Sequence, residues 1–372
     1  MVAKTDRAAD AIDRRHMLAA LALAARGLGN VAPNPAVGCV IVAGGRTVGR
    51  GFTQPGGRPH AETVALAQAG TRARGATAYV TLEPCSHHGA TPPCADALVD
   101  AGIARVVAAI SDPDARVAGR GLQRLRDAGI TVETGLCAAE AERLNEGFLT
   151  VQRQQRPMVT LKLALSLDGR IATGNGRSKW ITGPEARRQV HLMRAAHDAI
   201  AIGIGTALAD DPELTCRLPG LEAHSPRRVI FDSGLRLPPS SRLADLSQVA
   251  TIVVTLPGAD PARRAALEGA GIEVVELTAA PEGGVDVRTA LEALAQMGVT
   301  RLMLEGGGTL ATAFLKAGLV DALAIFTAPV VLGGDGYPAI AALGLDDPGL
   351  GARFTAEGSV LIGADRLDLY HR

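Results

Sequence analysis

The chain has 372 residues, 47% of them hydrophobic, and its 38 Lys and Arg residues balance 38 Asp and Glu residues. This length predicts two or three domains with sizeable cores. A neutral chain with 3% aromatic residues lacks the basic surface and stacking platforms of nucleic-acid binders, so we expect no nucleic-acid partner. Its five cysteines do not indicate a disulfide framework, and no run approaches the roughly 18 apolar residues of a membrane span. Since residues 1–13 also lack an apolar signal core, we expect a cytoplasmic protein without a membrane partner.

The first 150 residues predict an alternating α/β layer. Apolar periodicity and Gly or Pro boundaries indicate helices at 13–26, 60–70, 94–101, 119–128 and 138–149. Between them, short β-rich runs indicate strands at 37–43, 47–52, 77–82, 105–110 and 130–134, the first two joined by a hairpin turn at Gly44 and Gly45. Strands that alternate with helices favour a largely parallel sheet with helices on both faces.

A histidine and two cysteines lie where loops meet these elements. His60 begins an Ala-rich helix, Cys85 follows a strand, and Cys94 follows Pro93 at the start of another helix. Three such ligands leave one corner of a zinc tetrahedron to water, as hydrolytic zinc sites do. Glu62, two residues past the histidine, is free to carry a proton, which is the arrangement of zinc-dependent nucleobase deaminases. The sequence therefore predicts a catalytic Zn²⁺ site.

Two alternatives to this site stay open. His60, Cys85 and Cys94 are individually compatible with ordinary buried side chains. His87 and His88, in the long loop between the cysteines, are rival zinc ligands, and a fourth protein ligand would make the metal structural. Asn34, on the loop before the first strand, is a candidate for hydrogen bonds to a polar heterocycle or a turn-forming residue.

A polar, basic stretch at Val151–Pro157 predicts the domain boundary. Beyond it we expect helices at 184–195, 261–270, 287–297 and 309–317, and strands at 158–166, 199–204, 228–231, 250–255, 272–277, 301–304, 323–328 and 366–371. Glycine-rich turns at Gly203–Thr206 and Glu305–Gly308 follow strands, and the second precedes a helix. Both are typical of backbone that approaches a phosphate, with plain tight turns as the alternative.

Longer motifs resemble the bifunctional deaminase/reductase of riboflavin biosynthesis. In the first half these are Ala32–Pro35 with Val37–Cys39, His60–Glu62, and Thr81–Cys94, which reads TLEPCSHHGATPPC. In the second half they are Leu161–Gly169, Ser178–Thr182, Thr206–Pro212, which reads TALADDP, and Glu305–Gly308. The resemblance covers nearly the whole chain.

The resemblance implies two domains with two activities. Residues 1–150 would form a cytidine-deaminase-like three-layer α/β/α domain that removes an amino group from a phosphorylated pyrimidine. Residues 151–372 would form a dihydrofolate-reductase-like α/β domain that reduces the ribosyl side chain to ribityl with NADPH. The small phosphorylated pyrimidine is thus the expected partner. The sequence leaves the oligomeric state open, with a homo-oligomer among the expectations.

The resemblance also assigns residues in the second domain. Cofactor contacts would be Ala164, Trp180, Thr206, Asp210, Ser233, Gly307 and Gly308. Substrate contacts would be Ser178, Arg194, Leu214, Arg217 and Glu305, to which the first domain adds Asn34. A guanidinium can hold a phosphate by two hydrogen bonds, although most arginines are solvated surface charges. Trp180 could equally fill a core. Lys162 and Asp168 are possible proton or orientation partners.

Two competing functions remain for test. A structural zinc clip would make the protein a nucleotide-binding or scaffolding module. A deaminase acting on nucleic-acid bases would show strong salt-dependent binding, which the neutral charge disfavours.

Overall fold

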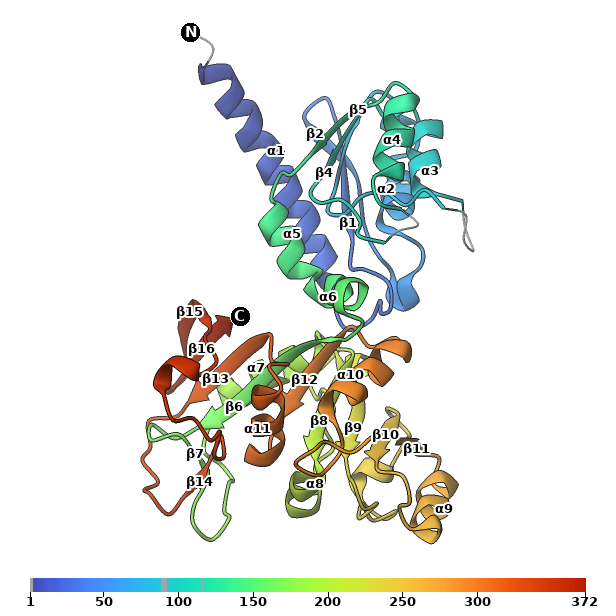
Figure 1. Ribbon diagram of the computed structural model, residues 1–372. Helices are drawn as coiled ribbons and strands as arrows, with labels where there is room; N and C mark the ends of the chain where they lie inside the picture. The colour runs from blue at the N-terminus through green and yellow to red at the C-terminus, as the bar shows by residue number, and fades with distance from the viewer. Residues whose placement is uncertain (1–2, 88–91, 115–116) are drawn as a thin grey trace. The chain divides into compact units, whose positions relative to one another are not determined.

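The computed structural model describes residues 3–87, 92–114 and 117–372 (Figure 1). The chain forms two compact units, Met1–Gln155 and Arg156–Arg372. Their division falls within the polar stretch 151–157, although helix α6, Glu146–Gln154, occupies the first residues of that stretch. Within the described ranges, no helix combines the length and the apolar character needed to cross a membrane.

The first unit is built on a five-stranded sheet with the order β2-β1-β3-β4-β5. The strands are β1 Gly38–Ala43, β2 Arg46–Phe52, β3 Thr77–Val80, β4 Arg105–Ala108 and β5 Thr131–Thr134. Strand β1 pairs antiparallel with both β2 and β3, whereas β3, β4 and β5 are parallel. The Gly44–Gly45 hairpin makes β1 and β2 antiparallel, as predicted, but the prediction of a largely parallel sheet is wrong for the β1–β3 pair, which is also antiparallel.

Helices cover both faces of this sheet (Figure 1). They are α1 Ala3–Ala24, α2 Ala61–Ala69, α3 Cys94–Asp100, α4 Arg120–Asp127, α5 Ala138–Leu144 and α6. Glycines let two helices approach the sheet closely: a Cβ on Gly38 would lie 1.9 Å from the carbonyl oxygen of Ala20 in α1, and one on Gly51 would lie 2.1 Å from that of Ala61 in α2. The close approach of α2 fixes the helix that begins just after His60.

Two helix boundaries in the first unit differ from the prediction. Helix α1 starts at Ala3, ahead of the predicted Asp13, because the preceding charged residues carry no apolar periodicity that the sequence could reveal. The single helix predicted at 138–149 is divided at Asn145, whose φ of −94° and ψ of 13° interrupt it between α5 and α6. Asparagine is a weak helix former, which suits it to this position.

The second unit contains a nine-stranded sheet with the order β11-β10-β9-β8-β12-β6-β13-β16-β15. Its strands are β6 Met158–Leu165, β8 Ala199–Gly203, β9 Arg227–Phe231, β10 Thr251–Thr255, β11 Glu273–Glu276, β12 Arg301–Glu305, β13 Ala322–Thr327, β15 Thr355–Ile362 and β16 Asp365–His371. The strands from β11 to β13 in this order are parallel, and β16 and β15 complete the sheet as an antiparallel hairpin. A small separate sheet pairs β7 Arg170–Ala172 with β14 Tyr337–Pro338.

Side chains on β8 alternate between two cores. Ala199 and Ala201 face the cluster that contains α10 Val287–Gln296 and α11 Gly308–Lys316. Ile200 and Ile202 face the opposite cluster, which contains residues of α8 Ile204–Asp210 and α9 Pro261–Gly269. Helix α7, Pro184–Ala195, packs through a third cluster against β13 and β16. The second unit is thus also a three-layer α/β/α structure.

Four elements of the second unit, one helix and three strands, escaped prediction. Helix α8 occupies 204–210, where we expected only a glycine turn, because burial of Ile204 and Ala207 outweighs the poor helix propensity of Gly205. Strand β15 was missed because it is exposed along its length and lacks the alternation of a half-buried strand. The short strands β7 and β14 carry no pattern of their own.

Candidate active sites

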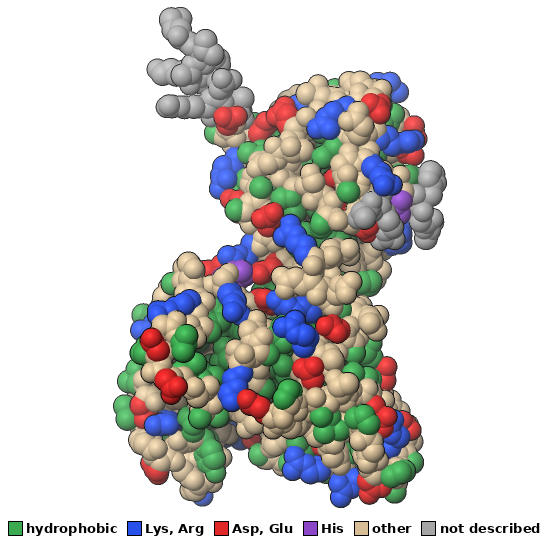
Figure 2. All heavy atoms as spheres, viewed as in Figure 1, with side chains coloured by type: hydrophobic (Ala, Val, Ile, Leu, Met, Phe, Trp, Pro, Cys, Tyr) green, Lys and Arg blue, Asp and Glu red, His purple; other side chains and the backbone are tan. Residues whose placement is uncertain are grey.

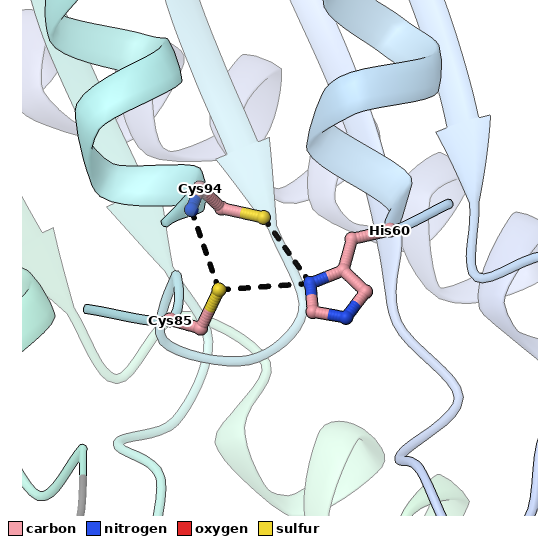
Figure 3. Close-up of side chains that lie close together, drawn as sticks. All are labelled: His60, Cys85 and Cys94. Atoms are coloured by element: carbon pink, nitrogen blue, oxygen red, sulfur yellow. Dashed lines mark hydrogen bonds between the residues drawn. The ribbon is translucent and has the colours of Figure 1, made fainter. Parts of the chain in front are cut away.

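The predicted zinc ligands meet in the first unit. His60, Cys85 and Cys94 offer ligand atoms that all lie within 4.8 Å of one another (Figure 3). The Nδ1 atom of His60 lies 3.2 Å from Sγ of Cys94 and 3.6 Å from Sγ of Cys85. Ligand atoms around tetrahedral zinc with sulfur and nitrogen donors lie roughly 3.4–3.8 Å apart. The donor set and its spacing therefore fit one zinc ion.

Local structure delivers each ligand to this point. His60 is the N-cap residue of α2, and Cys94 is the first residue of α3, preceded by Pro93. Cys85 lies beyond the end of β3, outside regular structure, and its Sγ accepts a hydrogen bond of 3.3 Å from the backbone N–H of Cys94. These positions agree with the predicted ones.

Glu62 lies beside the ligands on the first turn of α2 and is only 3% exposed. Burial, followed by the negative charge of the Cys85 thiolate, raises the pKa of Glu62 to about 7. A hydrogen bond from the Cys94 thiol lowers the pKa of Cys85 to about 4, and the same bond, together with burial, raises the pKa of Cys94. A cation bound here would favour both thiolates. Glu62 is then the one titratable neighbour left to exchange a proton.

Of the two rival ligands only His87 belongs to the described residues, and it does not join this group. His87 is absent from the cluster of metal-ligating side chains found among the described residues, although its buried Nδ1 has no hydrogen-bond partner there. His88 lies outside the described residues. Among the described residues the group therefore has three protein ligands, the number that a hydrolytic site uses.

Asn34 packs on the loop that leads to His60. A Cβ on Gly57 would lie 1.9 Å from its side-chain nitrogen, so only glycine permits this contact. The Asn34 side chain is partly exposed. Its role as a substrate contact stays a prediction.

In the second unit, the candidate residues gather where parallel strands end. Ala164 lies near the end of β6, Thr206 follows β8, Ser233 follows β9, and Glu305 ends β12. Because β6, β12, β8 and β9 are parallel, their carboxyl ends share one edge of the sheet. Ligands of open α/β sheets bind at this edge.

Glu305 is the centre of a buried charge cluster at this edge. Its carboxylate accepts hydrogen bonds from Nε and Nη2 of Arg194 at 2.7 and 3.0 Å, and Nζ of Lys162 lies 3.5 Å away. Burial by itself would raise the pKa of Glu305, but the two cations outweigh it and hold the pKa at about 2. Glu305 is therefore a fixed anion near neutral pH.

The same contacts limit what Arg194 can offer a phosphate. The guanidinium presents its two-nitrogen edge to Glu305, and its Nη1 donates to the carbonyl oxygen of Thr215 at 3.0 Å. Arg217 is more exposed, and its Nη1 lies 3.0 Å from Glu213. Of the two predicted arginines, Arg217 has the more exposed side chain and is therefore the more accessible to a ligand.

The glycine turn after β12 faces Thr206. Gly306 and Gly307 adopt φ values of 101° and 76°, and a Cβ on Gly307 would lie 3.1 Å from Oγ1 of Thr206. Side chains at Gly306 and Gly307 would fill the space beside Thr206. The open turn fits a phosphate-bearing cofactor. Gly308, in contrast, packs against the carbonyl oxygen of Pro338, 2.9 Å from an added Cβ.

Trp180 is 70% exposed, which excludes the core-filling alternative. Its ring is stacked by the guanidinium of Arg187, 4.3 Å from the ring centroid, a contact that no sequence pattern suggested. Ser178 lies on the same loop before α7, and Asp210 ends α8. Leu214 is buried with a φ of 57°, so only its backbone is available to a ligand.

Asp168 is engaged with its own loop and with the segment that follows β13. It accepts hydrogen bonds from Ser166 and from the backbone N–H groups of Leu332 and Gly333, which lower its pKa to about 2. It can orient this loop, but it carries no proton near neutral pH.

Comparisons with known proteins match both units. The family described as "Cytidine and deoxycytidylate deaminase zinc-binding region" matches residues 10–110, and "RibD C-terminal domain" matches residues 157–366. Fold and site thus define a zinc-binding deaminase domain joined to a reductase domain.

Whole-chain relatives narrow this class to one family. Riboflavin biosynthesis protein RibD of Escherichia coli is 47% identical over 87% of this chain and 89% of its own length, and that of Aquifex aeolicus is 43% identical over 87% and 88%. A RibD structure from Acinetobacter baumannii matches with a TM-score of 0.88 at 40% identity, covering 97% of this chain and 99% of that one. The deaminase/reductase of Thermotoga maritima matches with a TM-score of 0.85 at 34% identity and the same coverage. The chain belongs to the RibD family and is a bifunctional deaminase and reductase of riboflavin biosynthesis.

Proposed function

We propose that the first unit hydrolyses the 2-amino group of 2,5-diamino-6-(5-phosphoribosylamino)pyrimidin-4-one, with His60, Cys85 and Cys94 as the zinc ligands. The supporting observation is the three-donor group with a buried carboxyl beside it. Zinc bound there supplies a water molecule of lowered pKa. Glu62 accepts the proton of the attacking water and delivers it to the departing amine, so that water is consumed and ammonia leaves.

For the second unit we propose reduction of the ribosyl side chain to ribityl by hydride from NADPH. The turn at Gly306–Gly307 and Thr206 would hold a cofactor phosphate, with Ala164, Trp180, Asp210, Ser233 and Gly308 as further cofactor contacts. The cofactor supplies the hydride, and the protein aligns it with the sugar carbon.

The substrate would lie at the same strand edge. Arg217 would hold the substrate phosphate. Arg194 and Glu305 are bonded to each other and would contact the substrate through hydrogen-bonding capacity that this pair does not use. Ser178 and the backbone of Leu214 complete the proposed set, and Asn34 serves the deaminase site.

The proposed partners are small molecules and copies of the chain itself. Figure 2 shows acidic and basic side chains interspersed on the visible face of each unit, in keeping with a net charge of zero and with no nucleic-acid partner.

Five free cysteines, two of them proposed thiolate ligands, favour the reducing cytoplasm. We further propose a homo-oligomer, to be measured by light scattering at several protein concentrations, where a constant monomer mass would refute it.

A coupled assay with the pyrimidine substrate tests both activities. Ammonia release should precede NADPH oxidation, and Cys85→Ser should stop the first while leaving the second intact on supplied deaminated intermediate. NADPH should give a higher kcat/KM than NADH. If ammonia release survives Cys85→Ser, the zinc assignment is wrong. If NADH serves equally well, the cofactor assignment is wrong.

A further inference from the structure

A second buried carboxylate lies next to the zinc ligands but makes no part of the deaminase site described above. Glu83 is 3% exposed and precedes Cys85 by two residues. Each of its two oxygens accepts hydrogen bonds from backbone N–H groups of one distant segment. Oε1 accepts from Gly121 at 2.9 Å and Leu122 at 3.3 Å, and Oε2 accepts from Asp112 at 3.2 Å and Gly119 at 3.0 Å.

Through these bonds Glu83 caps the N-terminus of helix α4, although it lies far from that helix in the sequence. Gly119, the N-cap residue, has no side chain to bind the first N–H groups of the helix. The Glu83 carboxylate takes that place, and its negative charge suits the positive end of the helix. Helix α4 in turn touches the cysteine turn directly, since a Cβ on Gly121 would lie 2.0 Å from the carbonyl oxygen of Pro84.

Cys85 needs such support because no helix or strand holds it. The backbone of Glu83 donates to Ile110 at 2.9 Å, and the carbonyl oxygen of Cys85 accepts from Ala95 at 3.1 Å. The turn from Glu83 to Cys85 is therefore tied to the end of β4, to α3 and, through the Glu83 carboxylate, to α4. The Glu83 carboxylate accepts four of these hydrogen bonds, whereas the ties to Ile110 and Ala95 are single backbone bonds.

We propose that Glu83 is a positioning residue for the zinc site: by binding the backbone of Asp112 and of Gly119–Leu122, as a clamp, it fixes Sγ of Cys85 at the distance that the metal requires. This inference rests on the zinc assignment proposed above. It predicts that loss of the clamp weakens metal binding and slows deamination, while substrate recognition and the reductase unit are unaffected.

By thermodynamic linkage, the Glu83 clamp and zinc binding should strengthen each other. If the clamp strengthens zinc binding by some factor, zinc strengthens the clamp by the same factor. Zinc should therefore slow hydrogen exchange of the Gly121 and Leu122 amides, which do not touch the metal ligands. A carboxylate that only stabilised α4 would show no such coupling.

The principal test is Glu83→Gln in the full-length chain. The substituted amide turns an acceptor into a donor that faces N–H groups, so it breaks half of the clamp at almost constant volume. We expect the zinc dissociation constant, measured by chelator competition, to rise about 10- to 100-fold. The absorption bands of the Co²⁺-substituted protein should shift, and kcat for deamination should fall with KM unchanged. Equal zinc affinity and an unshifted Co²⁺ spectrum would overturn the proposal.

Asp198→Asn is the matched control. Asp198 is a buried carboxylate of the second unit that likewise accepts backbone N–H groups, from Thr300 at 2.7 Å and Arg301 at 2.9 Å. Its substitution should leave zinc affinity unchanged. Reductase activity on deaminated intermediate checks that the second unit of the Glu83→Gln chain is intact, and circular dichroism checks the first.

Two further measurements guard against a misfolded variant. Gly121→Ala pushes α4 away from Pro84 without altering any charge, and should also weaken zinc binding. Hydrogen exchange of the unaltered chain with and without zinc needs no variant, and unchanged exchange at Gly121 and Leu122 would refute the proposal. If the unaltered chain itself fails to bind zinc, the proposed function is at fault and not the role of Glu83.

Discussion

The two candidate active sites are assembled in opposite ways. In the first unit, His60, Glu62, Cys85 and Cys94 come from 35 consecutive positions of the sequence and project from the starts of helices and one loop. In the second unit, Lys162, Arg194 and Glu305 come from separate strands and a helix, with Arg194 and Glu305 111 residues apart. A metal site needs a few strong donors at short spacing, whereas a cofactor site uses the shared edge of a sheet.

The difference also concerns charge. The deaminase site gathers three acidic groups, two cysteine thiols and a buried carboxyl, and a bound cation would favour the thiolate forms of the cysteines. The reductase site already contains its own counter-charges, because Arg194 and Lys162 neutralise Glu305. The first site should therefore depend on metal, and the second on its internal ion pairs.

Substitution of Glu62 tests the first half of this contrast and has the largest expected effect. In Glu62→Gln, ammonia release should fall about 10²- to 10⁴-fold, because the proton carrier is lost. Zinc content, measured by atomic emission, should not change, and neither should reduction of supplied intermediate. A variant that deaminated at the normal rate would remove Glu62 from the chemistry.

Substitution of Glu305 tests the second half of this contrast, the dependence of the reductase site on its internal ion pairs. Glu305→Gln leaves Arg194 and Lys162 buried without their counter-ion, which should cost the second unit about 3–5 kcal/mol in urea unfolding. The matched control is Glu133→Gln, which breaks a half-exposed pair with Arg105 and should cost under about 1 kcal/mol. Equal losses in the two variants would contradict the role of Glu305 as the counter-ion of a buried charge cluster.

The pH dependence of stability offers a smaller effect of known sign. The pKa of Glu305 is about 2 in the folded chain, below its ordinary value of 4.5. Its contribution, on the order of 3 kcal/mol, is therefore fully present above about pH 4.5 and is lost as the pH falls toward 2. Urea unfolding between pH 6 and 3 should show a steeper loss in the native chain than in Glu305→Gln. Parallel curves would count against the charge cluster.

Trp180 gives the smallest expected change in stability. Because it is 70% exposed, Trp180→Ala should alter the free energy of unfolding by no more than about 0.5 kcal/mol. NADPH binding should nevertheless weaken about tenfold, or 1.4 kcal/mol. Leu350→Ala, also at a 70% exposed position, is the matched control and should leave NADPH binding unchanged. Identical cofactor affinity in both variants would remove Trp180 from the cofactor site.

The contrast between the sites also explains what the sequence could reveal. Helix α7 has the bounds that Pro184 and its apolar spacing predicted, and the zinc ligands lie together as their spacing predicted. Residues that meet only through topology left no local pattern, as with Glu83 on α4. Strand β15 was missed for a related reason, since an exposed strand has no buried face to pattern it.

The chain has a single tryptophan, and it lies on an exposed loop of the second unit. Its indole emission is consequently an intrinsic optical reporter of that unit, to which the deaminase unit contributes no tryptophan signal. Titration of the intact enzyme with dinucleotide can be followed by quenching without a dye or a truncated chain. The same emission, recorded while a chelator removes zinc, would show whether loss of the metal changes the surroundings of Trp180 in the reductase unit.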